Sequence, residues 1–516
     1  MQTEKEYIIG REINALRCES IGEYALPDYN TDVKKLLSIR TCAFPTGKFV
    51  GDDLLEFSGT VGYEVVYLDA ENSITHTEFS TDYEAAVRIS SDTYCDSDIK
   101  TSVSACNVRL IGPRKFSVKC SLDSDVRIAE KRVYAVGGDA FIEYEPEIVS
   151  GTAQVFSPVF GVGDIREISE EITSLDGVIV DEVEVLLCDV TGEIGSVDAT
   201  ESGATVKGNI KASVLYKNGD DIPKSVEKVI PYSQEIAGDG FLECGALEGY
   251  VDITSAKASV NPTEEGVAIA IALSFVPKIY AKKNSEIDIV ADAYLKERGS
   301  DNEYSEFAYT EHICTERSES NFVGEYHFDD GEIDKIDAII HSDGTARVDL
   351  CEILDSAVKI AGEIKFSAIA CQISEDGEYN YLPIKFALPF EHNVNINCQK
   401  HDNMRVIPNV CVRDVKMDVS ENNLSVSAAL FVCISLFSEK RQRCLGASYL
   451  TDEEFRRDES VVTVYYPDAS ESLFDIAKRF HTSAKSIAEA NRLTETVFAS
   501  QTSAVGGMGI KKLLIK

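Results

Sequence analysis

Hydrophobic and polar residues alternate along most of the chain, a pattern that predicts β-strands with one buried face. The clearest examples each carry a glycine followed by four alternating apolar or small positions: SGTVGYEVVY at 58–67, KGNIKASVLY at 207–216 and AGEIKFSAIA at 361–370. The glycines, Gly59, Gly208 and Gly362, are 149 and 154 residues apart. This interval is the length of a whole domain rather than of a solenoid repeat. The sequence therefore predicts three tandem β-rich domains.

Side chains also match between the repeats at fixed distances from each glycine. The matched sets are Val61, Ile210 and Ile364; Tyr63, Ala212 and Phe366; Val65, Val214 and Ala368; and Tyr67, Tyr216 and Ala370. A further aromatic residue follows each strand, and we align Phe79, Tyr232 and Phe390 as equivalent. Because alternation places these positions on one face, we expect the aromatic side chains to lie in the core.

Each repeat ends in a predicted hairpin and begins with a short segment of less certain type. The hairpins span 102–126, 252–276 and 409–437, with turns at Gly112-Pro113, at Asn261-Pro262 and near Asn422-Asn423. The opening segments, 32–41, 164–173 and 332–341, fit either a short helix or a strand. The predicted domains are 1–137, 138–297 and 298–450, and the apolar-poor segment 451–460 is predicted to be an exposed linker.

Residues 461–516 have a different pattern, which predicts strand, helix, helix and strand. VVTVYY at 461–466 is β-branched and aromatic, and IKKLLI at 510–515 is a closing strand. Ser472 and Asp475 have capping-box spacing, and Thr482 or Ser483 caps the second helix. The residues expected to form the core of this module are Leu473, Ile476, Phe480, Ile487 and Asn491.

Charge separates this module from the rest of the chain. The 516 residues carry a net charge of −38, which argues against nucleic acid or an anionic lipid surface as a main partner. Residues 461–516 contain seven Lys or Arg and five Asp or Glu, a net charge of +2, so the remaining residues carry −40. Asp475, Lys478, Arg479 and Lys485 project away from the apolar stripe of the predicted helices. They form either a solvated helix face or a partner-binding patch.

No motif in the sequence points to catalysis, to a cofactor or to a metal. GxSxG, GxxxxGK[ST] and HExxH motifs are absent, and the fourteen cysteines include no CxxC. His312 and His327 lie near Cys314 without matching any metal-binding spacing. The first residues contain no apolar core of signal-peptide length, and the apolar stretch 267–276 is about half of a membrane span. We therefore expect a cytoplasmic, non-enzymatic chain with reduced cysteines and no membrane span.

The C-terminal module resembles a LysM domain. The matching positions are Pro467, Ser472-Leu473, Ile476-Ala477, Phe480, Thr482-Ser483 and Asn491. The resemblance implies a βααβ fold. The chain has Ser470-Glu471 where the family usually has Gly-Asp in its glycan-binding loop, and 494–508 also departs from the family pattern. Glycan binding is therefore not the expected activity of the module.

The repeats resemble the SPOCS domains of clostridial spore-coat proteins. The similarity lies in ESIGEYALPDYNTDVKKLLSI at 19–39 and FSGTVGYEVVYLDAENSITHTEFS at 57–80. Tandem SPOCS-like domains followed by one LysM-like domain is the arrangement of SipL-like spore morphogenesis proteins. This resemblance implies a scaffold that acts in the mother cell at the forespore surface. It also implies that the LysM-like module binds the SpoIVA-like ATPase of the coat, with other coat or forespore-membrane proteins as further partners. The alternative is a LysM protein that binds peptidoglycan.

Overall fold

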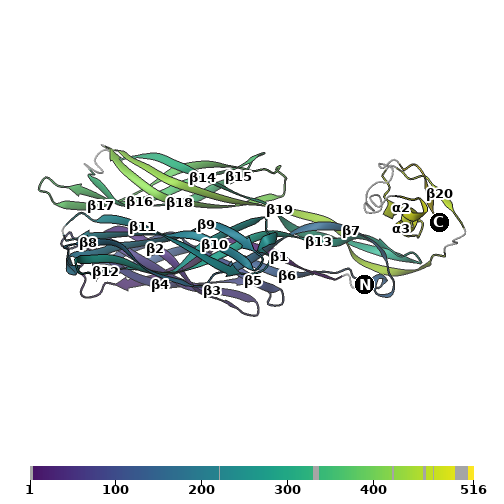
Figure 1. The fold of residues 1–516 in the computed structure, drawn as a ribbon, viewed down its shortest axis with the longest axis horizontal. Helices are drawn as coiled ribbons and strands as arrows, with labels where there is room; N and C mark the ends of the chain where they lie inside the picture. The colour runs from purple at the N-terminus through teal and green to yellow at the C-terminus, as the bar shows by residue number, and fades with distance from the viewer. Residues whose placement is uncertain are drawn as a thin grey trace.

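The protein was analysed as a computed structural model that describes residues 4–219, 221–328, 336–420, 423–456, 461–468, 470–493 and 510–515. Strands make up 76% of the structure and helices 5%, which confirms the predicted mainly β fold. The molecule is elongated, with a bundle of β-sheets at one end and a small helical module at the other (Figure 1).

Residues 5–134 form two packed antiparallel sheets, here called unit 1. One sheet has the order β1-β6-β5 and the other the order β2-β3-β4. The strands are β1 (Lys5–Ala25), β2 (Val33–Val50), β3 (Leu54–Asp69), β4 (Ile74–Arg88), β5 (Tyr94–Gly112) and β6 (Lys115–Tyr134). Val61, Tyr63, Val65 and Tyr67 point between the sheets and are buried, as the alternation predicts.

Two further units repeat this strand order. In unit 2 the sheets are β9-β10-β11 and β12-β13-β7, with β8 also paired to β13; in unit 3 they are β15-β16-β17 and β14-β19-β18. Unit 2 comprises β7 (Glu147–Val162), β8 (Arg166–Asp176), β9 (Val183–Thr200), β10 (Gly203–Asn218), β11 (Lys224–Ala237), β12 (Ala246–Pro262) and β13 (Gly266–Tyr294). Unit 3 comprises β14 (Arg298–His327), β15 (Ala338–Ile353), β16 (Ala357–Ile373), β17 (Tyr379–Asn395), β18 (Met404–Ser420) and β19 (Asn423–Glu454). The short helices are α1 (Ala140–Glu143), η1 (Val180–Glu182) and η2 (Phe241–Glu243). The division into separate domains at the predicted boundaries stays a prediction.

The repeat glycine marks the same structural position in every unit. Gly59, Gly208 and Gly362 each lie beside a register shift in the neighbouring strand and opposite an aromatic residue: Tyr83, Tyr232 and Phe390 respectively. A Cβ atom at any of the three glycines would overlap a backbone oxygen of the shifted strand. The chain therefore needs glycine there, and the aromatic ring covers the exposed backbone.

One aromatic alignment in the sequence prediction needs correction, and the open choice between helix and strand for the opening segments is resolved as strand. Tyr83, not Phe79, is the equivalent of Tyr232 and Phe390, because Phe79 pairs with Tyr63 rather than with the glycine. The segment 164–173 contributes to β8, which pairs with β13. The segment 32–41 instead lies in β2, an edge strand of the sheet β2-β3-β4. The third opening segment is a strand from Ala338, and its residues 332–335 lie outside the described residues.

The predicted linker is also partly wrong. Thr451–Glu454 belong to the end of β19, which pairs with β14 as far as Arg298 and Glu454. Phe455 then donates its backbone N–H to the carbonyl of Glu297 at 2.9 Å. Residues 457–460 lie outside the described residues.

Each unit contains one three-stranded sheet of consecutive strands, here called its meander sheet: β2-β3-β4, β9-β10-β11 and β15-β16-β17. The three meander sheets meet on their outer faces. Seven residues after each repeat glycine, Val66, Leu215 and Ile369 point away from their own sandwich cores, and each is at most 1% exposed. They form one apolar cluster together with Leu37, Leu68, Ile74, Leu186, Leu187, Ile340, Cys371 and Tyr381. The middle strand of each meander therefore buries both faces, one within its unit and one against the other units.

Polar contacts fix units 1 and 2 beside this shared cluster. Glu184 on β9 accepts hydrogen bonds from Thr75 at 2.6 Å and from Lys217 at 2.9 Å, and its carboxylate lies 3.2 Å from Nδ1 of His76. Burial raises the pKa of Glu184, but the hydrogen bonds from His76, Thr75 and Lys217 outweigh it and lower the pKa to about 2.

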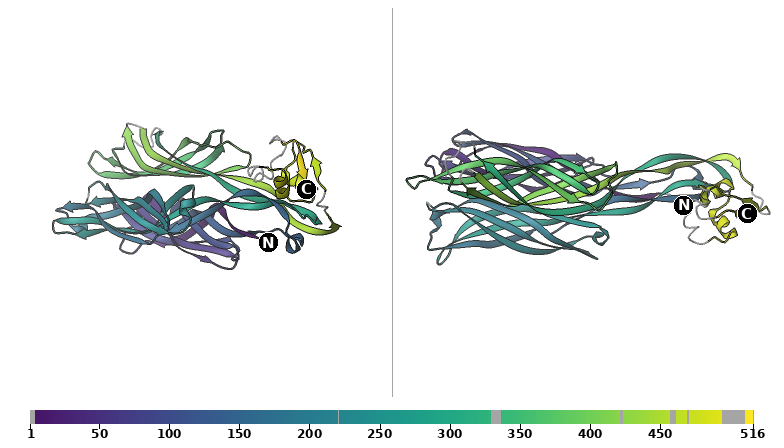
Figure 2. Two further views of the ribbon diagram at one scale, coloured as in Figure 1. Left: turned by 45° about the vertical axis from the view of Figure 1, so that its right-hand side comes forward. Right: turned by 90° about the horizontal axis from the view of Figure 1, so that it is seen from above.

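Four long strands leave the units and form a stalk. The stalk comprises β7, residues 278–294 of β13, residues 298–312 of β14 and residues 437–454 of β19. Figures 1 and 2 show these strands running towards the helical module. Tyr134 at the end of β6 lies between the stalk layers and donates to Leu445 O at 3.2 Å, while Val290 N donates to its hydroxyl at 3.1 Å. Unit 1 is thereby tied to the stalk between its base and its tip.

Leu215→Ala tests the shared cluster. It removes a fully buried side chain from the junction of the three units, and we expect a loss of about 2–4 kcal/mol of unfolding free energy. Val229→Ala on β11 is the matched control, because Val229 is 57% exposed, and it should change stability by less than about 0.5 kcal/mol. The measurement is the first unfolding transition in a thermal or urea scan. Equal transitions for the two variants would contradict the shared cluster.

Glu184→Gln tests the polar contact between units 1 and 2 through its pH dependence. The folded pKa of about 2 lies below the unfolded value, so the charged carboxylate stabilises the protein above about pH 4.5 and loses this effect as pH falls towards 2. We expect the variant to be less stable by about 1–3 kcal/mol at pH 7, with the difference shrinking by pH 3. Urea unfolding at both pH values measures this, with the exposed Glu182→Gln as control. A difference that does not change with pH would contradict the assignment.

Candidate partner-binding module at the end of the stalk

The C-terminal module is built from four short elements: β20 (Thr463–Tyr465), α2 (Leu473–Arg479), α3 (Ala484–Ala490) and β21 (Leu513–Ile515). β20 and β21 pair in antiparallel fashion. Ser472 caps α2 in a reciprocal capping box with Asp475, and Ser483 caps α3 through the backbone N–H of Ser486. These caps satisfy N–H groups that two-turn helices otherwise leave unpaired.

The expected core residues of the module lie together. Leu473, Ile476 and Ile487 are at most 1% exposed, and Phe480 is half-buried with its ring edge-on to Tyr465. Asn491 acts through its amide rather than by apolar packing. Its side chain donates to Leu514 O at 2.7 Å and accepts from Leu514 N at 2.7 Å. Asn491 thus holds α3 against β21.

The module docks on the tip of the stalk through a small mixed interface. Tyr294, at the end of β13, donates its hydroxyl to Thr482 O at 2.5 Å, and its ring packs edge-on against Phe474. Val149 and Ala291 belong to the same apolar cluster. His481 stacks on Phe455 with ring centroids 3.6 Å apart, and burial lowers the pKa of this histidine. The module is therefore held by one aromatic anchor and a few neighbours.

An ion pair completes the docking interface. Lys478 on α2 binds Asp292 at 2.6 Å. Asp292 is oriented from the other side by Tyr304 at 2.7 Å and by Asn302 at 2.9 Å. Because the carboxylate is positioned by these neighbours, Lys478 meets a fixed acceptor.

The four residues of the expected partner-binding patch have separate roles. Lys478 faces the stalk, Asp475 forms the capping box, and Arg479 pairs with Glu471 and with the hydroxyl of Tyr465. Lys485 is exposed on α3. The structure therefore uses three of the four within the chain. Sequence reasoning missed Asp292 and Tyr294, which lie 186 and 188 residues from their partners and carry no local signal.

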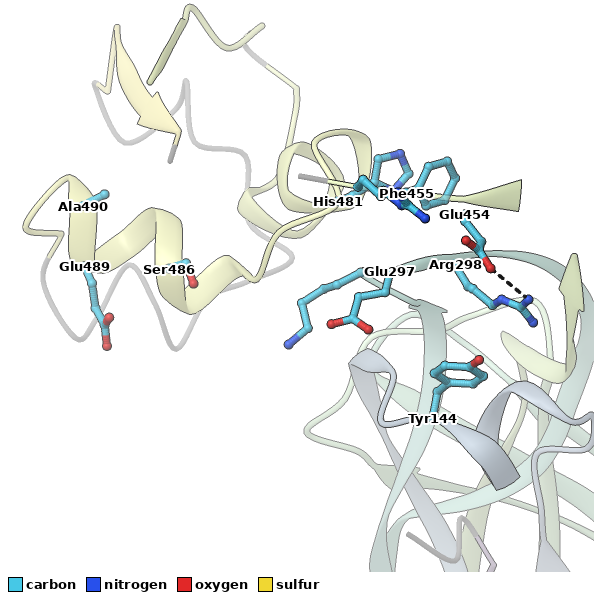
Figure 3. Close-up of a pocket in the computed structure, with 11 residues that line it drawn as sticks. Tyr144, Glu297, Arg298, Glu454, Phe455, His481, Ser486, Glu489 and Ala490 are labelled. Atoms are coloured by element: carbon cyan, nitrogen blue, oxygen red, sulfur yellow. Dashed lines mark ion pairs between the residues drawn. The ribbon is translucent and has the colours of Figure 1, made fainter. Parts of the chain in front are cut away.

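An open cleft of about 1090 Å³ separates α3 from the stalk tip (Figure 3). Glu297, Arg298, Glu454 and Tyr144 line the cleft on the stalk side, and Glu489 and Ser486 line it on α3. Arg298 and Glu454 form an ion pair at 3.5 Å. The walls of the cleft carry both positive and negative side chains, so the cleft favours neither an anionic nor a cationic ligand.

Other candidate chemistry has structural explanations. Within the described ranges no group of three potential ligands could hold a metal ion, and His312 is buried with its Nε2 at 2.9 Å from the Thr315 hydroxyl. Burial lowers the pKa of His312 to about 4. The cysteines are free thiols. None of the described helices is long and apolar enough to cross a bilayer.

Comparison with known proteins returned no matching family model, no matching curated protein and no matching solved structure. The protein has three six- or seven-stranded β units, a stalk and a docked helical module. The evidence for a function lies in this chain's own residues.

Tyr294→Ala tests the docking interface. The variant removes the ring against Phe474 and the hydrogen bond to Thr482 O, so we expect the module to detach from the stalk. Small-angle X-ray scattering should show a broader distance distribution, and protease should cleave faster between the stalk and α2. Tyr449→Ala is the matched control, because Tyr449 is a stalk residue 45% exposed to solvent. Identical scattering from the two variants would show that other contacts hold the module.

Proposed function

We propose that this chain is a non-enzymatic scaffold of the spore coat. Its three β units form a rigid body, and its C-terminal module, a LysM-like domain, binds a SpoIVA-like coat ATPase at the forespore surface in the mother cell. The observation that carries the proposal is the position of the module, which is presented at the far end of a stalk built from strands of units 2 and 3 (Figure 2).

The internal repeats support a structural role for the body. Each unit has the same strand order, the same glycine with an aromatic cover and the same buried outer position. The shared cluster fixes the units relative to one another, as a scaffold requires. The resemblance of the repeats to SPOCS domains is the link to the spore coat.

The module supports a binding role. The order β20, α2, α3 and β21 agrees with the βααβ order that the resemblance implies, and Leu473, Ile476 and Ala477, which carry the resemblance, lie in the core of the module. Glu471 stands where the family usually has the aspartate of the glycan-binding loop. Its carboxylate accepts from the Tyr465 hydroxyl at 2.7 Å and from Asp468 N at 3.0 Å. The hydrogen bond to Glu471, followed by burial, raises the pKa of Tyr465. The Glu471 carboxylate is therefore already engaged by contacts within the module, including an ion pair with Arg479.

Affinity capture from sporulating cells tests the proposed function. Full-length protein should retain the coat ATPase. A 1–460 truncation should capture at least about tenfold less ATPase, equivalent to about 1.4 kcal/mol of binding free energy. Lys485→Glu on α3 should weaken capture, whereas Lys416→Glu, on an exposed strand of unit 3, is the charge-matched control. Equal retention of the ATPase by the truncation would contradict the role of the module. Sedimentation of the full chain with purified peptidoglycan would instead support the glycan-binding alternative.

A further inference from the structure

We propose that the free edge of β20 docks an extended partner segment in which apolar and acidic residues alternate, and which adds to the module as a third strand. The identity of the biological partner rests on the proposed function, whereas the binding site follows from the geometry of the module. The two edges of the small β20–β21 sheet differ, and the difference defines where a strand can add.

The edge of β21 is closed. Both the N–H and the C=O of Leu514 are bound by the side chain of Asn491, at 2.7 Å each. A side-chain amide presents a donor and an acceptor side by side, as a neighbouring strand does, and so satisfies the edge. A further strand cannot pair at Leu514 without displacing Asn491.

The edge of β20 is open. Val464 lies directly opposite Leu514 in the antiparallel ladder. Because the backbone groups of Leu514 point to Asn491, this is a non-hydrogen-bonded pair, and the N–H and C=O of Val464 also point away from the ladder. Within the described part of the chain these two groups have no hydrogen-bond partner. They are the donor and acceptor that an added strand needs.

The side chains along this edge are apolar and exposed. Val462, Val464 and Tyr466 alternate along the strand, so they share a face, and they are 49%, 47% and 69% exposed. Tyr465 points the other way and packs against Phe480. An edge strand normally carries charge or proline to discourage pairing, and this one carries neither at these positions.

Charge selects the occupant. Lys511 and Lys512 precede β21, are exposed, and form no ion pair within the described residues. Arg479 is already paired with Glu471. Lys511 and Lys512 lie on the β21 side of β20, so two strand spacings, about 10 Å, separate them from an added strand, which is within the Debye length at about 0.1 M salt. Two free cations at this range favour a segment whose polar positions are acidic.

The site remains accessible in the docked module. The module contacts the stalk through α2 and the turn after it, with Lys478, Phe474, His481 and Thr482, and His481 stacks on Phe455 at the end of β19. Among the hydrogen bonds, the ion pair and the ring contacts that join the described part of the module to the stalk, none involves residues 462–466. Strand addition and docking therefore use different faces.

The experiment uses the full chain and a synthetic octapeptide of alternating glutamate and valine. Fluorescence anisotropy measures its affinity, and hydrogen exchange read by mass spectrometry locates it. We expect saturable binding that weakens with added salt, and slower exchange at residues 462–466. The charge-reversed lysine–valine peptide and a glutamate–valine peptide of shuffled order should bind at least about tenfold more weakly.

Two substitutions of one residue separate the backbone from the side chain. Val464→Pro removes the outward N–H, and proline is tolerated where that N–H faces away from the sheet. We expect Val464→Pro to lose at least about tenfold in affinity and Val464→Thr, which keeps the N–H, to lose less. Unchanged exchange protection of α2 and α3 in both variants confirms folding.

Several results would overturn the proposal. They are peptide affinity in Val464→Pro equal to that of the unsubstituted chain, equal binding of the charge-reversed peptide, protection outside residues 462–466, or no saturable binding at about 1 mM peptide. Loss of ATPase capture alone would count against the proposed function, whereas loss of peptide binding alone would count against this site.

Discussion

Burial of both faces of the three meander sheets is the constraint on which the rest of the structure depends. Val66, Leu215 and Ile369 occupy equivalent positions in their units and meet in one apolar cluster. A sheet with two buried faces cannot turn relative to its neighbours without exposing apolar surface. The cluster therefore sets the orientation of all three units, and with it the direction in which β13, β14 and β19 leave them.

Much of the fold could be predicted from local alternation, because period-two patterning reports directly on one buried face. The inner positions Val61, Ile210 and Ile364 followed from it. The outer positions were visible as apolar residues, but their role depends on how units far apart in sequence pack. The alignment of Phe79 with Tyr232 failed for a related reason: the correct partner, Tyr83, is defined by the strand register across from Gly59, and spacing alone does not show register.

The module was predictable to the extent that its interactions are local. The capping box of Ser472 and Asp475 and the packing of Leu473, Ile476 and Ile487 follow from helical spacing. Its docking was not predictable. Lys478 occupies the same position on the helix surface whether it faces water or Asp292. Nothing near it in sequence indicates which residue is its ion-pair partner. Asn491 was expected in the core, and it lies there for its hydrogen bonds to a strand 23 residues away.

The stalk has a mechanical consequence. The paired strands β7 and β13, and β14 and β19, run lengthwise from the sheets to the module, so a pull on the module acts along the strands rather than across them. Under such a load the hydrogen bonds of each ladder resist together in shear, instead of opening one after another as in a hairpin peeled from its end. The docking contacts around Tyr294 are few and lie outside these ladders. Tension would therefore detach the module first and leave the three units intact, because the docking interface separates at a lower force than the strand ladders of the stalk.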